Sequence, residues 1–266
     1  MHRIFLTVSA VLLAWSPVQA GDAIHVVDSD YPPFTYRKDN APAGFSIEVL
    51  QEMAKRADVA LTIDYYPFRR AVAMSTTEKN ALITSMSRNE ERNKQYQWIG
   101  PVYTATINLY RLKERTDLQI ASLDQIGTRT IGTGAGFKII DDLVKAGIDR
   151  KQIEDVSPEN LNITKLFKRR VDYVALNDWV FAYLVAQEGK SFSEVEKVMA
   201  LDGKEAAIYG KQTATGGVGD GAKDDSAAYY AVQKDTDPAV VARLQAALDA
   251  MRTDGAYDKI MQQYFK

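Results

Sequence analysis

Segments that predict β-strands alternate with segments that predict α-helices through most of this 266-residue chain. The stretch 44–58 repeats apolar residues at helical spacing and lies between two β-rich runs, 23–27 and 61–66. A further short helix at 68–74 precedes a strand at 81–84. This alternation predicts a parallel sheet with helices on its faces. Because the pattern then begins again, we expect two α/β units in tandem.

The second unit has its own set of short elements, and the chain ends in helices. We expect strands at 106–112, 129–134, 153–156 and 172–176, and helices at 122–126, 137–147, 160–170 and 178–189. Residues 210–226 are rich in Gly, Thr, Asp and Lys, which predicts a long exposed loop. A strand at 229–234 and helices at 238–255 and 257–265 follow. Ser46 is the expected N-cap of the first helix.

The N-terminal residues have the features of an export signal. Arg3 precedes a mostly apolar run at 4–15 that is too short to span a membrane. Val18 and Ala20 then form a small-residue cleavage pattern. We expect cleavage after Ala20, leaving a soluble protein that diffuses freely in a bacterial periplasm.

The composition excludes several classes of function. The chain has no cysteine and two histidines, and His2 lies in the expected signal. A zinc site built from cysteine and histidine therefore lacks ligands. A Ser-His-Asp nucleophile would have to use His25, which lies on the expected first strand and is better explained as structural or solvent-facing. The net charge of −2 argues against nucleic-acid binding. We expect no catalytic residue, metal or cofactor.

Two motifs lie where strands end and helices begin. "GTGAG" at 132–136 can present free N–H groups to an anion. Its spacing differs from the dinucleotide fingerprint, so a small carboxylate fits better than a nicotinamide cofactor. Asp178 lies at the carboxyl end of another expected strand, where ligands of open α/β sheets bind. The alternative for 132–136 is a turn that simply needs glycine, and the alternative for Asp178 is a helix-capping aspartate.

Aromatic and polar residues form two further candidates. "SDYPPF" at 29–34 follows the first strand and can present Tyr31 as an aromatic wall, although ordinary loop packing explains it equally well. "ALITSMSRNEER" at 81–92 brings Ser85 and Ser87 to a strand end, with Arg92 shortly after. A guanidinium can hold a carboxylate with two parallel hydrogen bonds. Taken alone, each charge in this loop is best explained as surface charge.

Together these stretches resemble the periplasmic solute-binding proteins of the polar-amino-acid ABC importers, known as bacterial extracellular solute-binding protein family 3. The resemblance rests on "DYPPFTY", "SMSRNEERNKQYQWIGPVY", "VDYVALND" and "LDAMRTDGAYDKIMQQYF", and covers nearly all of the mature chain. It implies an α/β fold of the periplasmic-binding-protein type II, with two Rossmann-like lobes and a ligand cleft between them. The expected lobes are 21–108 with 228–266, and 109–227, after a signal at 1–20.

The resemblance also implies roles for individual residues. Arg92 and Ser87 would bind the ligand carboxylate, with Ser85 beside them, and Asp178 would bind its ammonium. Asp28 matches a position that can touch the ligand side chain. The remaining expected ligand-binding residues are Tyr31, Phe68, Gly134, Ala135 and Gly136. In the family, the segment that matches 134–136 often carries threonine, and the position of Phe68 often carries tryptophan. These departures bear on which ligand is bound.

The sequence therefore favours a binding protein over an enzyme. We expect a monomer that closes on an amino acid or related carboxylate and delivers it to the membrane subunits of an ABC importer. One alternative is an exported enzyme of the same fold, similar to cyclohexadienyl or arogenate dehydratases, with Asp28 or Asp30 as general acid. Another is a sensory ligand-binding domain, which would normally continue into a membrane span.

Overall fold

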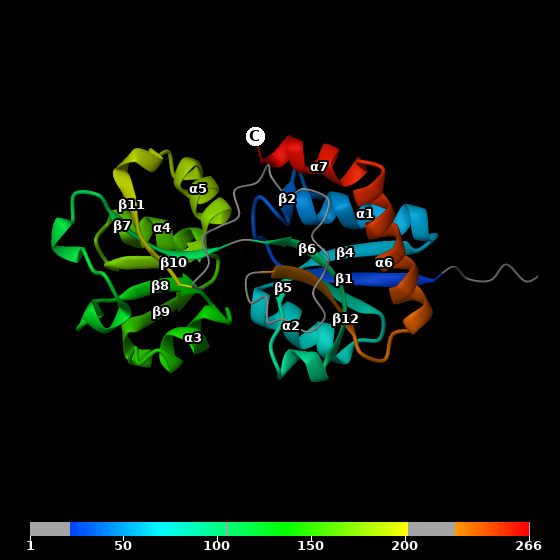
Figure 1. Cartoon of the computed structure of the whole chain (residues 1–266), viewed down its shortest axis with the longest axis horizontal. Coiled ribbons are helices and arrows are strands. Elements are labelled where there is room, and N and C mark those ends of the chain that lie inside the picture. The colour runs from blue at the N-terminus through cyan, green and yellow to red at the C-terminus, as the bar shows by residue number, and fades with distance from the viewer. Residues whose placement is uncertain (1–21, 105, 202–226, 266) are drawn as a thin grey trace, which may run out of the picture.

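The protein has two lobes, each built on its own five-stranded sheet (Figure 1). The computed structural model describes residues 22–104, 106–201 and 227–265. Two expectations lie outside these residues, namely the export signal cleaved after Ala20 and the loop at 210–226. Within the part described, no helix has both the length and the apolar character needed to cross a membrane.

The sheet of the first lobe has the strand order β4-β1-β5-β12-β6. Its strands are β1 (Ala23–Asp28), β4 (Ala60–Tyr65), β5 (Ala81–Ser87), β6 (Tyr96–Thr104) and β12 (Ala227–Gln233). β1 runs parallel to β4 and β5, whereas β12 runs antiparallel to β5 and β6. Val26 and Val27 point to opposite faces and both are fully buried. Both faces of β1 are therefore covered, as its nearly continuous apolar sequence predicts.

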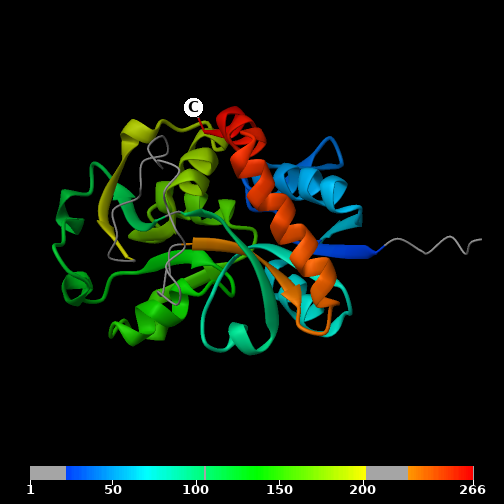
Figure 2. The same ribbon diagram turned by 45° about the vertical axis from the view of Figure 1, so that its right-hand side comes forward.

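Helices cover both faces of this sheet. α1 (Phe45–Ala57), α6 (Pro238–Thr253) and α7 (Ala256–Tyr264) pack against one another. α2 (Phe68–Thr77) contacts β1, β5 and β12 and shares a separate apolar cluster with Ile83. Figure 2 shows α6 and α7 beside α1, so the end of the chain returns to the lobe that contains its beginning.

The start of α1 differs from the prediction that Ser46 caps it. The N-cap is Gly44, and no side chain caps this end of the helix. Ser46 is instead fully buried inside the first turn, where its hydroxyl lies 3.2 Å from the hydroxyl of Ser85. Gly44 has a φ of 113°, and a Cβ there would lie 2.5 Å from the carbonyl oxygen of Phe34. The backbone thus approaches too closely here for any residue but glycine.

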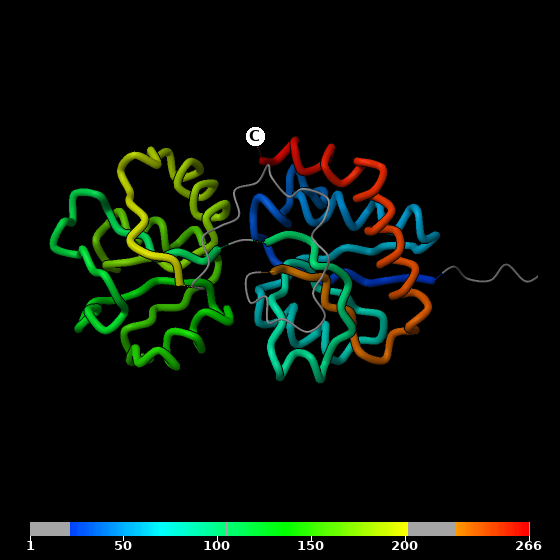
Figure 3. Tube along the Cα trace, in the orientation of Figure 1, coloured from blue at the N-terminus to red at the C-terminus, as the bar shows by residue number. Residues whose placement is uncertain are grey.

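The sheet of the second lobe has the strand order β11-β7-β10-β8-β9 (Figure 1). Figure 3 traces this lobe as the green-to-yellow part of the chain, beside the first lobe. Its strands are β7 (Ile107–Leu112), β8 (Ile131–Gly134), β9 (Ile153–Val156), β10 (Tyr173–Asn177) and β11 (Val195–Ala200), and its α-helices are α3 (Ile139–Lys145), α4 (Asn160–Phe167) and α5 (Asp178–Gln187). β8 runs parallel to β9 and β10, and β7 runs antiparallel to β10 and β11. α4 packs on β8 and β10, while Leu143 of α3 joins a second apolar cluster with Ile131 and Ile153.

The strands and helices expected from periodicity are found with one exception, most of them with shifted ends. The run 122–126 forms a 3₁₀ turn rather than an α-helix. The 3₁₀ helices are η1 (Arg92–Lys94), η2 (Thr116–Leu118), η3 (Leu123–Ile126), η4 (Arg150–Gln152) and η5 (Phe192–Glu194). The hairpin of β2 (Tyr36–Lys38) and β3 (Ala41–Ala43) and the edge strand β11 were not predicted. The two hairpin strands have three residues each, and all three strands are mostly exposed or half-buried, so they carry a weak apolar pattern.

The two lobes touch each other. Arg69 of α2 forms an ion pair with Asp155 of β9, with 2.7 Å between Nη2 and Oδ2. The rings of Trp179 in α5 and Phe265, just after α7, lie 4.8 Å apart. The lobes are therefore in contact with one another, and a pocket lies between them.

Candidate functional site

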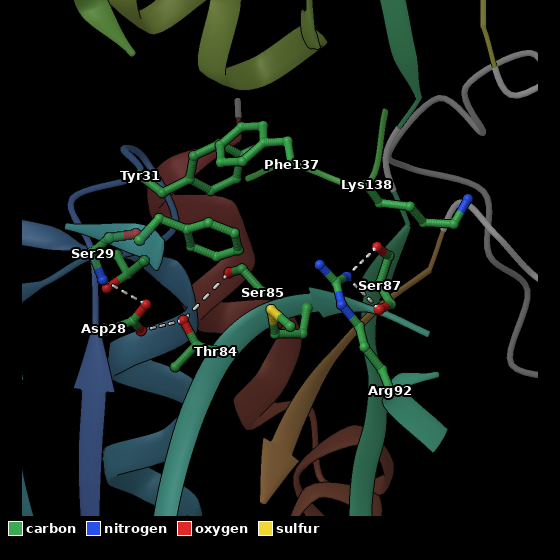
Figure 4. Close-up of a pocket in the computed structure, with 12 residues that line it drawn as sticks. Asp28, Ser29, Tyr31, Thr84, Ser85, Ser87, Arg92, Phe137 and Lys138 are labelled. Carbon is green, nitrogen blue, oxygen red and sulfur yellow. Dashed lines mark hydrogen bonds between the residues drawn. The ribbon is translucent and has the colours of Figure 1, made fainter. Parts of the chain in front are cut away.

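The pocket lies between the lobes, where β1 and β5 end (Figure 4). Carboxyl ends of neighbouring parallel strands meet at one edge of a sheet, so side chains that follow them converge there. The lining residues are Asp28, Ser29, Tyr31, Thr35, Phe68, Thr84, Ser85, Met86, Ser87 and Arg92 from the first lobe, and Phe137 and Lys138 from the second. They line a partly open pocket with a volume of about 70 Å³.

Arg92 supplies positive charge to the pocket. It begins η1, and its backbone N–H donates to Asn89 Oδ1 at 2.7 Å, which holds the turn. Its Nη1 donates to the carbonyl oxygen of Ser87 at 2.9 Å and to the Ser87 hydroxyl at 3.1 Å (Figure 4). Burial lowers the pKa of this guanidinium. No acidic side chain in the described residues forms an ion pair with Arg92, so an anion would complete its environment.

A bulge in β5 shapes the neighbouring wall. Between the pairs of Tyr229 with Met86 and of Ala231 with Ile83, the register of β5 against β12 shifts. Ser85 lies in this bulge and has a φ of 56°, which is rare for a residue other than glycine. Bulges of this kind redirect side chains and are common beside binding sites. The result is that Ser85 lines the pocket.

Asp28 is the acid at the other end of the pocket and is only 2% exposed. Its carboxylate accepts hydrogen bonds from the Ser29 N–H at 2.9 Å and from the Thr84 hydroxyl at 2.5 Å. Burial raises the pKa of this carboxyl to about 6, although these hydrogen bonds act to lower it. The pocket therefore has a cationic end and an anionic end, which suits a ligand with both charges.

Aromatic rings form the roof. Tyr31 comes from the loop after β1 and Phe68 is the first residue of α2, whereas Phe137 comes from the loop between β8 and α3. The Phe137 ring lies 5.5 Å from Tyr31 and 5.2 Å from Phe68, edge-on to both. Such edge contacts are favourable for aromatic pairs. The roof is thus shared between the lobes.

The structure brings together five of the nine residues expected to bind the ligand. Tyr31, Phe68, Ser85, Ser87 and Arg92 all line this one pocket. No group of three or more potential metal ligands is found among the described residues.

The other four expected residues lie outside the lining of the pocket. Ala135 N–H, expected to face an anion, donates to the carbonyl oxygen of Val156 at 3.0 Å. Gly134 is buried in β8, and Gly136, with a φ of 84°, is covered by the side chain of Arg69. The Ala135 N–H is therefore engaged within the second lobe, whereas the binding roles of Gly134 and Gly136 stay predictions.

Asp178 is held within the second lobe. Its Oδ1 accepts a hydrogen bond from the Tyr110 hydroxyl at 2.7 Å and another from the Asn108 amide. The N-cap of α5 is Asn177, whose side chain accepts from the N–H groups of Trp179 and Val180. Asp178 is therefore not the capping residue, and its carboxylate accepts from two side chains of β7.

Phe137 and Lys138 were missed by the sequence analysis. They follow the glycine motif directly, so the motif pointed to the correct loop but to residues slightly too early in it. The Lys138 ammonium is 2.6 Å from Asp142 Oδ2, one turn further along α3. Figure 4 shows Lys138 on the same side of the pocket as Arg92. Lys138 therefore adds a second cation there, already paired with an acid.

Comparison with known proteins places this geometry in a family. The model for bacterial extracellular solute-binding proteins, family 3, matches residues 24–266. The chain belongs to this family. These solute-binding proteins have the two-lobed periplasmic-binding-protein type II fold, and the expected fold class is confirmed.

Individual relatives of this family 3 protein are distant in sequence. The chain is 24% identical to the arginine-binding extracellular protein ArtP of Bacillus subtilis, over 49% of this chain and 47% of ArtP, so this match spans about half of each protein. It is 26% identical to the lysine/arginine/ornithine-binding periplasmic protein of Escherichia coli K12, over 90% and 85% of the two chains. A solved ancestral arginine-binding protein bound to arginine has a TM-score of 0.72 at 22% identity, covering 92% of this chain and 98% of that one.

Proposed function

We propose that this protein binds an amino acid or a similar small polar carboxylate in the periplasm and delivers it to an ABC importer. The observation that carries the proposal is Arg92, a cation in the pocket between two lobes with no acidic partner in the described residues. The named relatives are amino-acid-binding proteins of the periplasm or cell exterior, which supports the same use of the fold here.

Binding would begin on the first lobe. Arg92, with Nη1 already held by Ser87, would hold the ligand carboxylate, and Ser85 would donate a hydroxyl hydrogen bond. The expected lobes, 21–108 with 228–266 and 109–227, would then close as rigid bodies about their two connections. A ligand that contacts both lobes favours the closed state, which the importer would recognise.

Asp178 keeps its expected role only in another arrangement of the lobes. It does not line this pocket, and its carboxylate accepts from Tyr110 and Asn108. Within this proposal another arrangement of the lobes brings Asp178 to the ligand. Its carboxylate can then accept from the ligand ammonium while it still accepts from Tyr110 and Asn108. Asp28 is the acid that already lies in the pocket, and it offers a second partner for a positively charged group.

The test is replacement of Arg92 by alanine, with binding measured by calorimetry against a panel of amino acids and small organic acids. Leaving a buried charge without its partner costs about 2–5 kcal/mol, so affinity should fall at least about thirtyfold. Arg88→Ala is the matched control, because Arg88 is exposed on the same loop and does not line the pocket. Binding to Arg92→Ala at the affinity of the unmodified protein would contradict the proposal.

The enzyme alternative has less support. His25 is bonded to Glu78 and Asp64 and does not line the pocket. Asp28 is the remaining acid there, and the named relatives are binding proteins. Incubation with prephenate or arogenate, followed by measurement of product, separates the two functions. Turnover would refute a purely binding role.

A further inference from the structure

The second lobe inserts one aromatic ring into the pocket of the first. Phe137 lies edge-on to Tyr31 and to Phe68, at interplanar angles of 86° and 82°. Both partner rings belong to the first lobe, so Phe137 reaches across the cleft. Figure 4 shows it beside Tyr31 at the top of the pocket. Its ring therefore occupies space that a ligand could otherwise use.

The position of this ring is determined by the backbone around it. A Cβ at Gly134 would lie 2.5 Å from the Phe137 ring, so only glycine leaves room for the ring there. The Phe137 N–H donates to the carbonyl oxygen of Gly134 at 3.2 Å, which fixes the turn. The ring also packs against the apolar clusters of both lobes. Phe137 is thus packed between the two lobes and is not a freely exposed surface side chain.

The room that remains beside Arg92 is small, and the pocket is partly open. The cavity of about 70 Å³ is about half the size of a cavity of roughly 150 Å³ that accommodates benzene. Arg92, Ser85 and Ser87 line its polar side. A carboxylate with a few further atoms fits between the lobes as they lie here, whereas a side chain that extends from Arg92 toward Tyr31 and Phe68 would need the place of the Phe137 ring.

We propose that Phe137 sets the upper length of the ligand, so that the site takes a short carboxylate of about two or three carbons, such as a small amino or hydroxy acid. This inference rests on the proposed function, because it assumes that Arg92 holds the carboxylate. Phe137 acts as a specificity-determining residue through the volume it fills.

The experiment measures the affinities of a short set, glycine, L-alanine and L-lactate, and a long set, L-arginine, L-glutamine and L-phenylalanine. The unmodified protein should bind its best short ligand at least about tenfold more tightly than any long one, since one methylene in an apolar pocket is worth about ten- to two-hundredfold. Phe137→Ala should shift this ratio about tenfold or more toward the long set. Phe137→Leu, which keeps an apolar side chain, should shift this affinity ratio in the same direction but by less. If the alanine variant does not fold, the leucine variant is used for the test instead.

Phe192→Ala is the matched control, because Phe192 belongs to the same lobe, is 50% exposed and lies outside the pocket. It should leave the ratio unchanged.

Equal or tighter binding of long ligands by the unmodified protein, or a ratio unaffected by both Phe137 variants, would overturn the inference. Arg92→Ala is measured in each background. If it abolishes binding while the Phe137 variants change nothing, the proposed function stands and this inference fails. Absence of binding by every ligand would overturn both.

Discussion

Replacement of Asp28 by asparagine is expected to stabilise the protein at neutral pH. The Asp28 carboxyl is buried, and burial raises its pKa from 3.8 to about 6. A shift of about two units corresponds to about 3 kcal/mol of preference for the neutral form. At pH 7 the ionised carboxyl is therefore held in the folded state at a cost of about 3 kcal/mol, which asparagine avoids.

The advantage of asparagine should depend on pH in a defined way. The folded protein holds the proton of Asp28 more tightly than the unfolded chain, so it binds more protons between about pH 4 and 6. Its stability therefore falls as the pH rises through that window. The Asp28→Asn variant has no such proton, so it should gain little near pH 3 and most above about pH 7. Asparagine can also accept from the Ser29 N–H and donate to the Thr84 hydroxyl, which preserves both hydrogen bonds.

Urea unfolding of both proteins from about pH 3 to pH 8 measures this difference. Asp39→Asn is the control, because Asp39 is exposed in the turn between β2 and β3 and should show no comparable gain. An Asp28→Asn variant that is less stable than the unmodified protein at pH 7, or a difference independent of pH, would refute the reasoning. A gain in stability together with weaker ligand binding would show that the carboxylate is retained for function.

Two further predictions concern the first lobe. Gly44→Ala should destabilise the protein by about 3 kcal/mol, since the backbone there is in a region open only to glycine and a Cβ would lie against a carbonyl group. Gly189→Ala, with a positive φ but open space, should cost only about 1 kcal/mol, and equal losses in denaturant melts would contradict the close approach. Burial acts to lower the pKa of His25, but hydrogen bonds and charge from Glu78 and Asp64 raise it overall. The stabilisation is present below about pH 6.5 and lost as the pH rises through the raised pKa, so His25→Gln should lower the melting temperature at pH 5.5 more than at pH 9.

The parts of the fold that depend on local pattern could be predicted from the sequence. Ile47, Leu50 and Met53 repeat at helical spacing, and all three are buried on α1. The role of Ser46 could not be predicted, because its hydroxyl bonds to Ser85, which is distant in the sequence. The bulge that turns Ser85 toward the pocket likewise depends on how β12 pairs with β5. The Ser46–Ser85 contact and the bulge both depend on strand register, which cannot be read from a single sequence.

The candidate site was predicted best where residues lie at strand ends. Ser87 was noted at a strand end with Arg92 shortly after it, and the resemblance to the family then assigned both to the ligand carboxylate. Both line the pocket together with Tyr31. Phe137 and Lys138 were missed because the preceding glycines suggested an anion cradle. Whether a backbone N–H is free depends on its partner, and the partner of Ala135 lies on a neighbouring strand. Sequence spacing alone does not show this.

The position of β12 has a consequence for how the chain folds. β12 lies between β5 and β6, and its pairing of Ala228 with Ser87 joins residues on opposite sides of the second lobe in the sequence. The second sheet, in contrast, is assembled from one continuous stretch between Ile107 and Ala200. Closing a long loop slows folding because its entropy is lost before the contact forms. The second lobe can therefore assemble early, whereas the first sheet stays divided between β5 and β6 until the last part of the chain arrives.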